Sequence, residues 1–240
     1  MTLRATQPVI SDRVGKWPIA RLTGVGGLLM VAAIVINGPL SAMVEKYPSF
    51  WTSTAGADLG QFLQDPHRTG RATVFFALSN LIIVFAIPFF AGLRVLIKDS
   101  DPSGFLSGIV AIAVPLFLAG GLASEVFSHG MPIVMRSVPA YDLNLNDALA
   151  VQGLQYVALV QGQVALGVAL IALSLAEWKG EMLPRWISLL GAAAGVIDLV
   201  RPFGVTSPPL LIGLFIPTFG WIALTSVVLI HSSAISGEAS

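Results

Sequence analysis

Six long apolar runs divide this chain, and they constrain its fold more than any other feature. They extend over residues 22–44, 73–97, 105–128, 149–176, 187–200 and 210–230. Crossing a bilayer takes about 20 apolar residues, which every run except 187–200 provides. A span in lipid must be a helix, because an open strand leaves its backbone groups without partners. The pattern predicts an all-α integral membrane protein, a bundle of six transmembrane helices with a short fifth helix followed by an irregular Pro-rich segment.

The composition favours the same class. Only 11% of the residues are charged, whereas soluble domains carry about 25%. The formal net charge is zero and like charges form no block, so nucleic acid is not an expected partner. The absence of cysteine excludes disulfides and iron–sulfur clusters. We expect one transmembrane domain over 1–240, with an N-terminal segment 1–21, a helix bundle 22–230 and a tail 231–240.

Basic residues indicate the orientation, because Lys and Arg are enriched in the cytoplasmic segments of membrane proteins. With the N-terminus inside, the inner side holds Arg4, Arg13, Lys16, Arg21, Arg94, Lys98, Lys179 and Arg185, which is most of the 13 basic residues. The inner connections are then 98–104 and 177–186. The first run exceeds the apolar stretch of a signal peptide, so we expect an uncleaved helix. Both termini are predicted to be cytoplasmic.

The fifth run is too short to cross the bilayer by itself. Residues 187–200 extend about 21 Å at ~1.5 Å per residue, against a hydrocarbon core of about 30 Å. The segment 201–209 (RPFGVTSPP) contains three prolines and cannot simply continue the helix. We expect part of it at membrane depth, where irregular backbone needs protein or a water-lined cavity beside it. The alternative is a tilted helix with local thinning of the bilayer.

One stripe of the fifth helix combines small residues with an acid. Ser188, Gly191, Gly195 and Asp198 follow steps of three and four residues and therefore share a face. The two glycines form a GxxxG motif, which permits close approach of a neighbouring helix. Asp198 continues this stripe and is predicted to face protein rather than lipid. It can equally form an intrahelical ion pair with Arg201, three residues further on.

Polar side chains in four other places are expected near the same outer depth. Glu125 and His129 end the third run, one turn apart. Asn37 and Asn80 lie in the first and second runs, and a stripe of the fourth run holds Gln152, Gln155, Tyr156 and Gln163. We predict a cavity whose floor includes Asp198, Asn80 and Gln155. The alternatives are that the glutamines only bond neighbouring helices and that Glu125 and His129 are ordinary interfacial residues.

No metal or cofactor is predicted. His67, Glu125, His129 and Asp198 offer ligand atoms, but no HExxH or similar motif accompanies them. Haem needs axial ligands at bilayer depth, and the histidines lie at the ends of runs or outside them. A retinal Schiff base needs a lysine within a span, whereas all lysines lie outside the runs.

The stretch 183–191 (LPRWISLLG), followed by a small-residue helix and a last helix, resembles a group of uncharacterised bacterial multi-pass proteins known only as domains of unknown function. The resemblance covers about the last third of the chain. It implies a bacterial inner (plasma) membrane protein and carries over no catalytic residue. In having two acids in a helical membrane pocket, the expected site is also similar to membrane-bound terpene cyclases.

These patterns favour a membrane-embedded enzyme or binding protein acting on a lipophilic, lipid- or isoprenoid-like small molecule in the outer half of the bilayer. Two acids in differently buried sites can act as acid and base, so Asp198 and Glu125 are the candidate catalytic residues. The candidate substrate-binding residues are Asn37, Asn80, Gln152, Gln155, Tyr156, His129 and Arg201. Whether the chain is an enzyme stays open. The alternative is an accessory subunit with a helix-packing protein partner, or a small-solute transporter.

Overall fold

The computed structural model describes residues 17–45, 68–137, 145–180, 182–200, 202 and 208–237. Within them the chain forms six α-helices and one 3-10 helix, with no strand. The helices are α2 (Trp17–Glu45), α4 (Arg68–Leu96), η1 (Ile97–Ser100), α5 (Phe105–Ser137), α6 (Leu145–Gly180), α7 (Arg185–Val200) and α8 (Pro208–Gly237). Each α-helix contains one of the six apolar runs. The predictions of an all-α fold and of six helices are confirmed for the described residues.

Four helices contain stretches long and apolar enough to cross a membrane. These stretches are Pro18–Asn37, Thr73–Ser100, Phe105–Gly130 and Ala150–Gly180, and Ile216–Ser232 in α8 is a shorter apolar stretch. The helix α7 has 16 residues, about 24 Å at ~1.5 Å per residue, which confirms that the fifth helix is short. Composition and helix length thus suggest a membrane protein.

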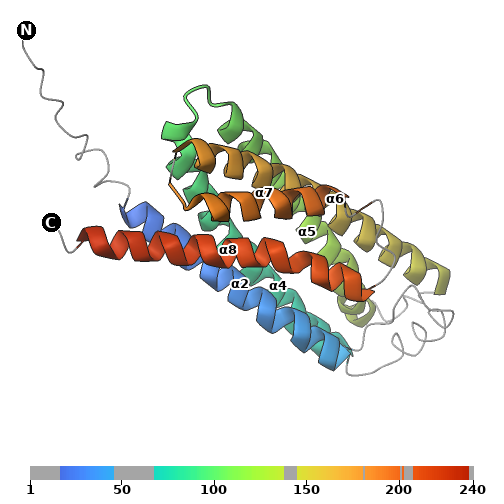
Figure 1. The fold of residues 1–240 in the computed structure, drawn as a ribbon. Coiled ribbons are helices and arrows are strands. Elements are labelled where there is room, and N and C mark those ends of the chain that lie inside the picture. The colour runs from blue at the N-terminus through green and yellow to red at the C-terminus, as the bar shows by residue number, and fades with distance from the viewer. Residues whose placement is uncertain are drawn as a thin grey trace, which may run out of the picture.

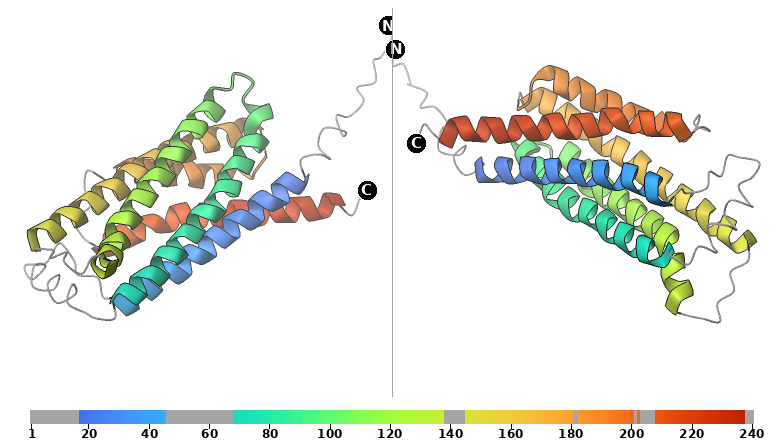
Figure 2. Two further views of the ribbon diagram at one scale, coloured as in Figure 1. Left: turned by 180° about the vertical axis from the view of Figure 1, so that it is seen from behind. Right: turned by 90° about the horizontal axis from the view of Figure 1, so that it is seen from below.

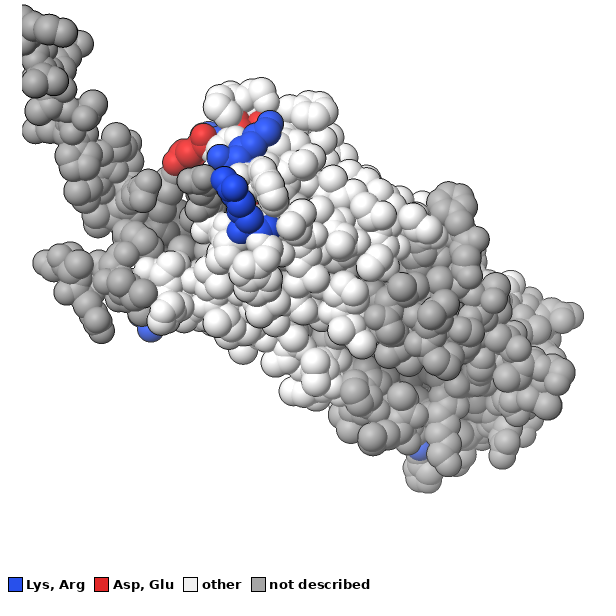
Figure 3. All heavy atoms as spheres, viewed as in Figure 1, with Lys and Arg blue, Asp and Glu red and all other residues white. Residues whose placement is uncertain are grey.

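The helices lie side by side along a common direction (Figures 1 and 2). α5 packs along α6, α2 packs against α4 and α8, and α7 packs between α6 and α8. The start of α2 and the end of α8 lie at the end of the bundle that carries η1 and the α6–α7 connection (Figure 1). We call this the charged end, because it holds Lys98, Asp99, Asp101, Lys179 and Arg185. Figure 3 shows charged side chains gathered there and a broad uncharged surface along the described helices.

Glycines allow the closest helix contacts. A Cβ atom at Gly195 would lie 2.7 Å from the carbonyl oxygen of Gly167 in α6, and one at Gly120 of α5 would lie 2.7 Å from Cα of Gly162. Such approaches leave no room for a side chain. The GxxxG motif of α7 therefore packs against α6, as the sequence predicts.

Edge-to-face aromatic contacts join three helices in the core. The ring centroid of Phe89 in α4 lies 5.0 Å from that of Phe90 and 6.2 Å from that of Trp221 in α8. Phe90 in turn lies 6.1 Å from Phe117 of α5. These spacings are typical of favourable aromatic pairs and link α4, α5 and α8 around the cavity described below.

The α4–α5 connection is closed by a carboxylate at the start of α5. Asp101 accepts a hydrogen bond from the backbone N–H of Ser107 at 2.7 Å and one from the Ser103 hydroxyl at 2.9 Å. Gly104 adopts a φ of 70°, a conformation that favours glycine. The first bond lowers the pKa of Asp101 from its ordinary value of 3.8, because it stabilises the charged form.

One sequence expectation about the charged end is wrong. Glu177 was expected in the connection 177–186, whereas α6 continues to Gly180 and the Glu177 side chain is 0% exposed. The physical reason is that α6 packs against both η1 and α7 and that Gly180 at its end lies against Ser100 of η1, so tertiary contacts bury a charged side chain that lies just past the apolar run. Arg201 and 203–207 lie outside the described residues, and with them the irregular segment and the Asp198–Arg201 pair.

Candidate functional site

A cavity of about 170 Å³ lies at the centre of the bundle, towards the end opposite the charged end. Five helices enclose it, and most of its wall is apolar. The lining residues are Met30, Ile34, Ser79, Ile82, Ile83, Ala86, Phe117, Leu118, Gly121, Glu125, Leu159, Gln163, Leu166 and Phe219. Among the described residues, only Ser79, Glu125 and Gln163 bring polar side chains to it. This combination of an apolar wall and few polar groups is typical of small-molecule sites.

Glu125 and His129 form an ion-pair contact at one side of the cavity. Nδ1 of His129 lies 2.8 Å from Oε2 of Glu125, and the side chains are 9% and 28% exposed, respectively. Oε2 has no hydrogen-bond partner among the described residues, and the contact is an ion pair when His129 is protonated. The two residues share one face of α5, as their spacing predicts, and they are in contact; Glu125 also lines the cavity.

Three neighbours hold the His129 ring. The Ser128 hydroxyl lies 2.9 Å from Nδ1, and it also donates to the Glu125 carbonyl oxygen at 3.2 Å. The rings of Phe75 and Phe76 in α4 each have their centroids 6.5 Å from that of His129. The imidazole is thus enclosed by aromatic side chains that the sequence pattern did not single out.

The two asparagines behave differently. Asn37 of α2 donates from Nδ2 to the Ser79 hydroxyl of α4 at 2.9 Å, so it reaches the cavity wall through Ser79. Asn80 donates to the carbonyl oxygen of Phe76 in its own helix at 2.8 Å and does not line the cavity. The sequence does not identify Ser79 as a site residue, because a single serine in an apolar helix does not indicate which neighbouring helix or cavity it faces.

The glutamine stripe of α6 meets the cavity at one position. Gln163 is buried, lines the cavity, and its Oε1 atom has no hydrogen-bond partner among the described residues. Gln152 is buried, and Gln155 and Tyr156 are half-buried, but none of these three lines the cavity. Gln161 points to another face, as expected from its position in the helix.

Asp198 is buried at the junction of three helices. Its side chain is 0% exposed, and Oδ2 accepts a hydrogen bond from the Thr218 hydroxyl of α8 at 3.0 Å. A Cβ atom at Gly167 of α6 would lie 3.1 Å from that of Asp198. The acid therefore faces protein, as predicted from the α7 stripe. It is not among the cavity-lining residues, although Thr218 immediately precedes the lining residue Phe219.

The described residues contain no group of three or more His, Cys, Asp and Glu side chains that could hold a metal ion. His67 lies outside the described residues.

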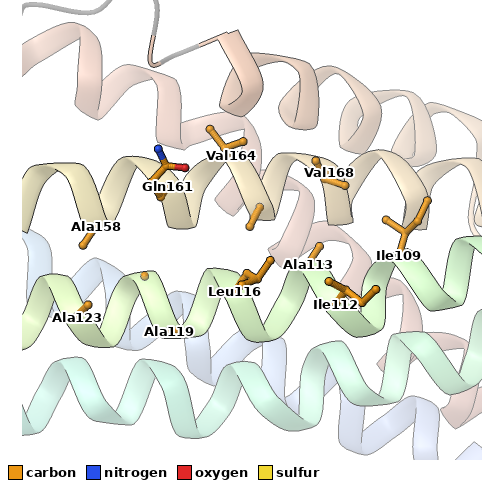
Figure 4. Close-up of a pocket in the computed structure, with 12 residues that line it drawn as sticks. Ile109, Ile112, Ala113, Leu116, Ala119, Ala123, Ala158, Gln161, Val164 and Val168 are labelled. Carbon is orange, nitrogen blue, oxygen red and sulfur yellow. The ribbon is translucent and has the colours of Figure 1, made fainter.

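A second hollow is a groove on the outer face of α5 and α6, of about 660 Å³. Its apolar side chains include Ile112 and Leu116 of α5 and Val164 and Val168 of α6 (Figure 4). Gln161 is the one polar side chain among its described lining residues. Small residues leave the space, because five alanines and a glycine line it: Ala113, Ala119, Gly120, Ala123, Ala158 and Ala165.

Comparison with family models, curated proteins and solved structures finds no match for this chain. The resemblance of 183–191 to bacterial multi-pass proteins therefore stays an expectation from the sequence.

Proposed function

We propose that this protein is embedded in a membrane and binds a lipophilic small molecule in the central cavity. The observation that supports the proposal is the apolar wall with three polar side chains, Ser79, Glu125 and Gln163. Apolar walls favour an apolar ligand, and a few polar groups fix its orientation. The Gln163 Oε1 atom and the Glu125 carboxyl group accept hydrogen bonds, so a hydroxyl group at one end of the ligand suits them.

The volume limits how much of the ligand is enclosed. A cavity of about 150 Å³ in another protein holds one benzene molecule, so about 170 Å³ encloses a ring or a short branched chain. A lipid- or isoprenoid-like molecule would place its polar end here and extend its remaining chain beyond the cavity.

The acid–base chemistry is proposed for Glu125, with His129 as its partner. A carboxyl group and an imidazole in contact can pass a proton to or from a bound hydroxyl group or carbon centre. Asp198 is proposed as the second acid. Its link to the cavity would run through Thr218 to Phe219, so Glu125 is the stronger candidate of the two.

Filling the cavity tests the proposal. Gly121 of α5 lines the cavity, and a Cβ atom there would meet no atom within 4 Å. We therefore expect Gly121→Met to fold and to occupy the cavity. Gly108→Met is the matched control, because it is on the same helix, is equally free of neighbours and lies away from the cavity.

The measurement is the shift in melting temperature of detergent-solubilised protein on adding geraniol or farnesol, two isoprenoid alcohols. A ligand at a hundredfold excess over its Kd stabilises the folded state by about 2.7 kcal/mol. The wild type and Gly108→Met are expected to show the shift, and Gly121→Met is expected to lose it. Equal shifts in all three proteins would contradict binding in the cavity.

An accessory subunit is the second candidate, and the α5–α6 groove favours it. A partner helix in this groove would bury its apolar wall and bond Gln161, and small residues allow close helix approach. Ala119→Leu fills the groove, so it should release the chain from any larger complex solubilised from native membranes. If the assembly keeps its size in this variant, the groove is not its interface.

We further propose that both termini are cytoplasmic in a bacterial inner membrane, from the basic residues before α2. Single cysteines placed at Ser53 and Ser236 should be labelled by an impermeant reagent from opposite sides. Labelling of both from one side would contradict the six-helix topology.

A further inference from the structure

Six buried polar atoms gather near the charged end, on α6, α7 and α8. They are Oγ of Ser174, both carboxyl oxygens of Glu177, Oγ of Ser188, Nε1 of Trp221 and Oγ1 of Thr225, and none has a hydrogen-bond partner among the described residues. All five side chains are at most 2% exposed. Buried polar groups in folded proteins are nearly always satisfied, with a few exceptions per 100 residues. A group of six in one region points to a bound species that satisfies them.

The helix register brings these residues to two adjoining levels. A Cβ atom at Gly191 of α7 would touch both Ser174 of α6 and Trp221 of α8, which defines the first level. One turn towards the charged end leads to Glu177 on α6, Ser188 on α7 and Thr225 on α8. These steps point the same way because α7 runs antiparallel to both neighbours (Figure 1). Residues three or four apart share a helix face, so we expect Glu177, Ser188 and Thr225 to face one another as the residues of the first level do.

The chemistry of this group selects its ligand. An ionised carboxylate buried without a partner is strongly disfavoured, so a buried carboxyl group either takes up a proton or is paired with a cation. A proton would satisfy one oxygen of Glu177 and would leave the hydroxyl groups beside it without a common partner, whereas a cation can bind all of them. One carboxylate and the hydroxyl oxygens of Ser174, Ser188 and Thr225 are hard oxygen ligands of the kind that hard cations take. A single negative charge balances a monovalent cation. A divalent ion would leave a net buried charge on this set of ligands, because Glu177 is the one acid among the buried side chains without hydrogen-bond partners in this group.

Basic side chains do not fill this role. Lys179 and Arg185 at the charged end are exposed, and the Arg185 guanidinium lies 5.6 Å from the ring centroid of Trp178. The Trp221 N–H is a donor only, so it can orient the Ser174 hydroxyl but cannot bind a cation. The Glu177 carboxylate is therefore the one charged ligand of the group.

We propose that Glu177, Ser188, Thr225 and Ser174 form a buried site for an alkali cation, Na⁺ in the first place. The site lies on the charged-end side of the Glu125 cavity, whose lining residue Phe219 precedes Trp221 by two positions on α8, and it does not depend on the function proposed for that cavity. Such a site would stabilise the contact of α7 with α6 and α8 only while the cation is bound.

The test is the melting temperature of the purified full chain as NaCl replaces N-methyl-D-glucamine chloride at constant ionic strength. The wild type is expected to show a saturable rise. Glu177→Gln is expected to abolish it, and Ser188→Ala or Thr225→Val to raise the half-saturating Na⁺ concentration about tenfold. Ser226→Ala is the matched control, because Ser226 is also buried in α8 but its hydroxyl donates to the Ile222 carbonyl oxygen at 2.7 Å. It should respond as the wild type does.

A wild-type protein that melts at the same temperature in both salts would overturn the proposal. So would a Glu177→Gln variant that keeps the full Na⁺ response, because the carboxylate would then not be a ligand. If Glu177→Gln does not fold, Ser188→Ala and Thr225→Val decide, since both retain the charge. An unchanged half-saturating concentration in these two variants would also exclude the site.

Discussion

Oε2 of Glu125 lies 2.8 Å from Nδ1 of His129, one helical turn further along α5. The pair stands where the apolar cavity meets the aromatic rings of Phe75 and Phe76. An acid at the wall of an apolar site is explained if it orients or protonates a bound molecule. It contributes little to folding, because the Glu125 side chain is 28% exposed.

Glu125→Gln should therefore separate binding from stability. Partly exposed ion pairs contribute about 0–1 kcal/mol, so the melting temperature should change little. Loss of a hydrogen bond to a charged group should weaken binding of an isoprenoid alcohol roughly tenfold to a hundredfold. Gln161→Leu, which faces the outer groove, is the control and should bind normally. Unaltered binding by Glu125→Gln would remove this residue from the site.

Thr218→Val tests the surroundings of Asp198. The valine keeps the shape but removes the hydroxyl that donates to Asp198 Oδ2 at 3.0 Å. Loss of a donor to a buried acceptor costs about 1–3 kcal/mol, so the melting temperature should fall. Asp198→Asn should couple with Thr218→Val in a double-mutant cycle. Additive effects of the two changes would mean that this hydrogen bond does not stabilise the fold.

Gly195→Ala should loosen the contact between α7 and α6. The added Cβ would lie 2.7 Å from the backbone carbonyl oxygen of Gly167, so a helix has to move, and overpacking typically costs about 1–3 kcal/mol. Gly153→Ala on the exposed side of α6 meets no atom within 4 Å and should instead gain up to about 1 kcal/mol of helix propensity. Denaturation of both variants in the same detergent gives the comparison; a stabilised Gly195→Ala would contradict the close contact.

The hydrogen bonds of Asp101 lead us to expect that the folded state loses stability in acid. Its pKa is lowered in the folded state, chiefly by the bond from the Ser107 backbone N–H. A lowered pKa stabilises the fold fully above the unfolded value, near 3.8, and this contribution is lost as pH falls through the folded pKa. Asp101→Asn should thus show a smaller fall in melting temperature than the wild type when the pH is lowered from neutral into this range. Parallel curves for the two proteins would show that the carboxylate is not linked to folding.

The sequence predicts the helices well because hydrophobic length decides them directly. It also predicts that Asp198 and the two glycines of α7 face protein, since periodicity assigns residues to helix faces. Periodicity does not decide which faces meet. Asn37 bonds to Ser79, and Asp198 bonds to Thr218. Both pairs depend on tertiary packing, so the sequence could not predict them.

At the cavity and at the charged end, too, the sequence does not show which helix faces meet. The fourth apolar run ends at residue 176, so the sequence predicts Glu177 in the connection 177–186, whereas α6 continues to Gly180 and buries the Glu177 side chain. The predicted cavity floor of Asp198, Asn80 and Gln155 differs from the described lining, in which Glu125 and Gln163 are the larger polar groups. Estimates of depth along separate helices place residues at a level but not around a common centre.

The central claim is that the cavity between the helices holds a lipophilic molecule. Native mass spectrometry of the protein purified from its membranes in mild detergent tests it most directly, because it weighs what stays bound. The wild type and Gly108→Met are expected to carry the same apolar adduct, and Gly121→Met is expected to lack it. An adduct retained equally by Gly121→Met, or a wild type that carries none and binds no added isoprenoid alcohol, would contradict the account.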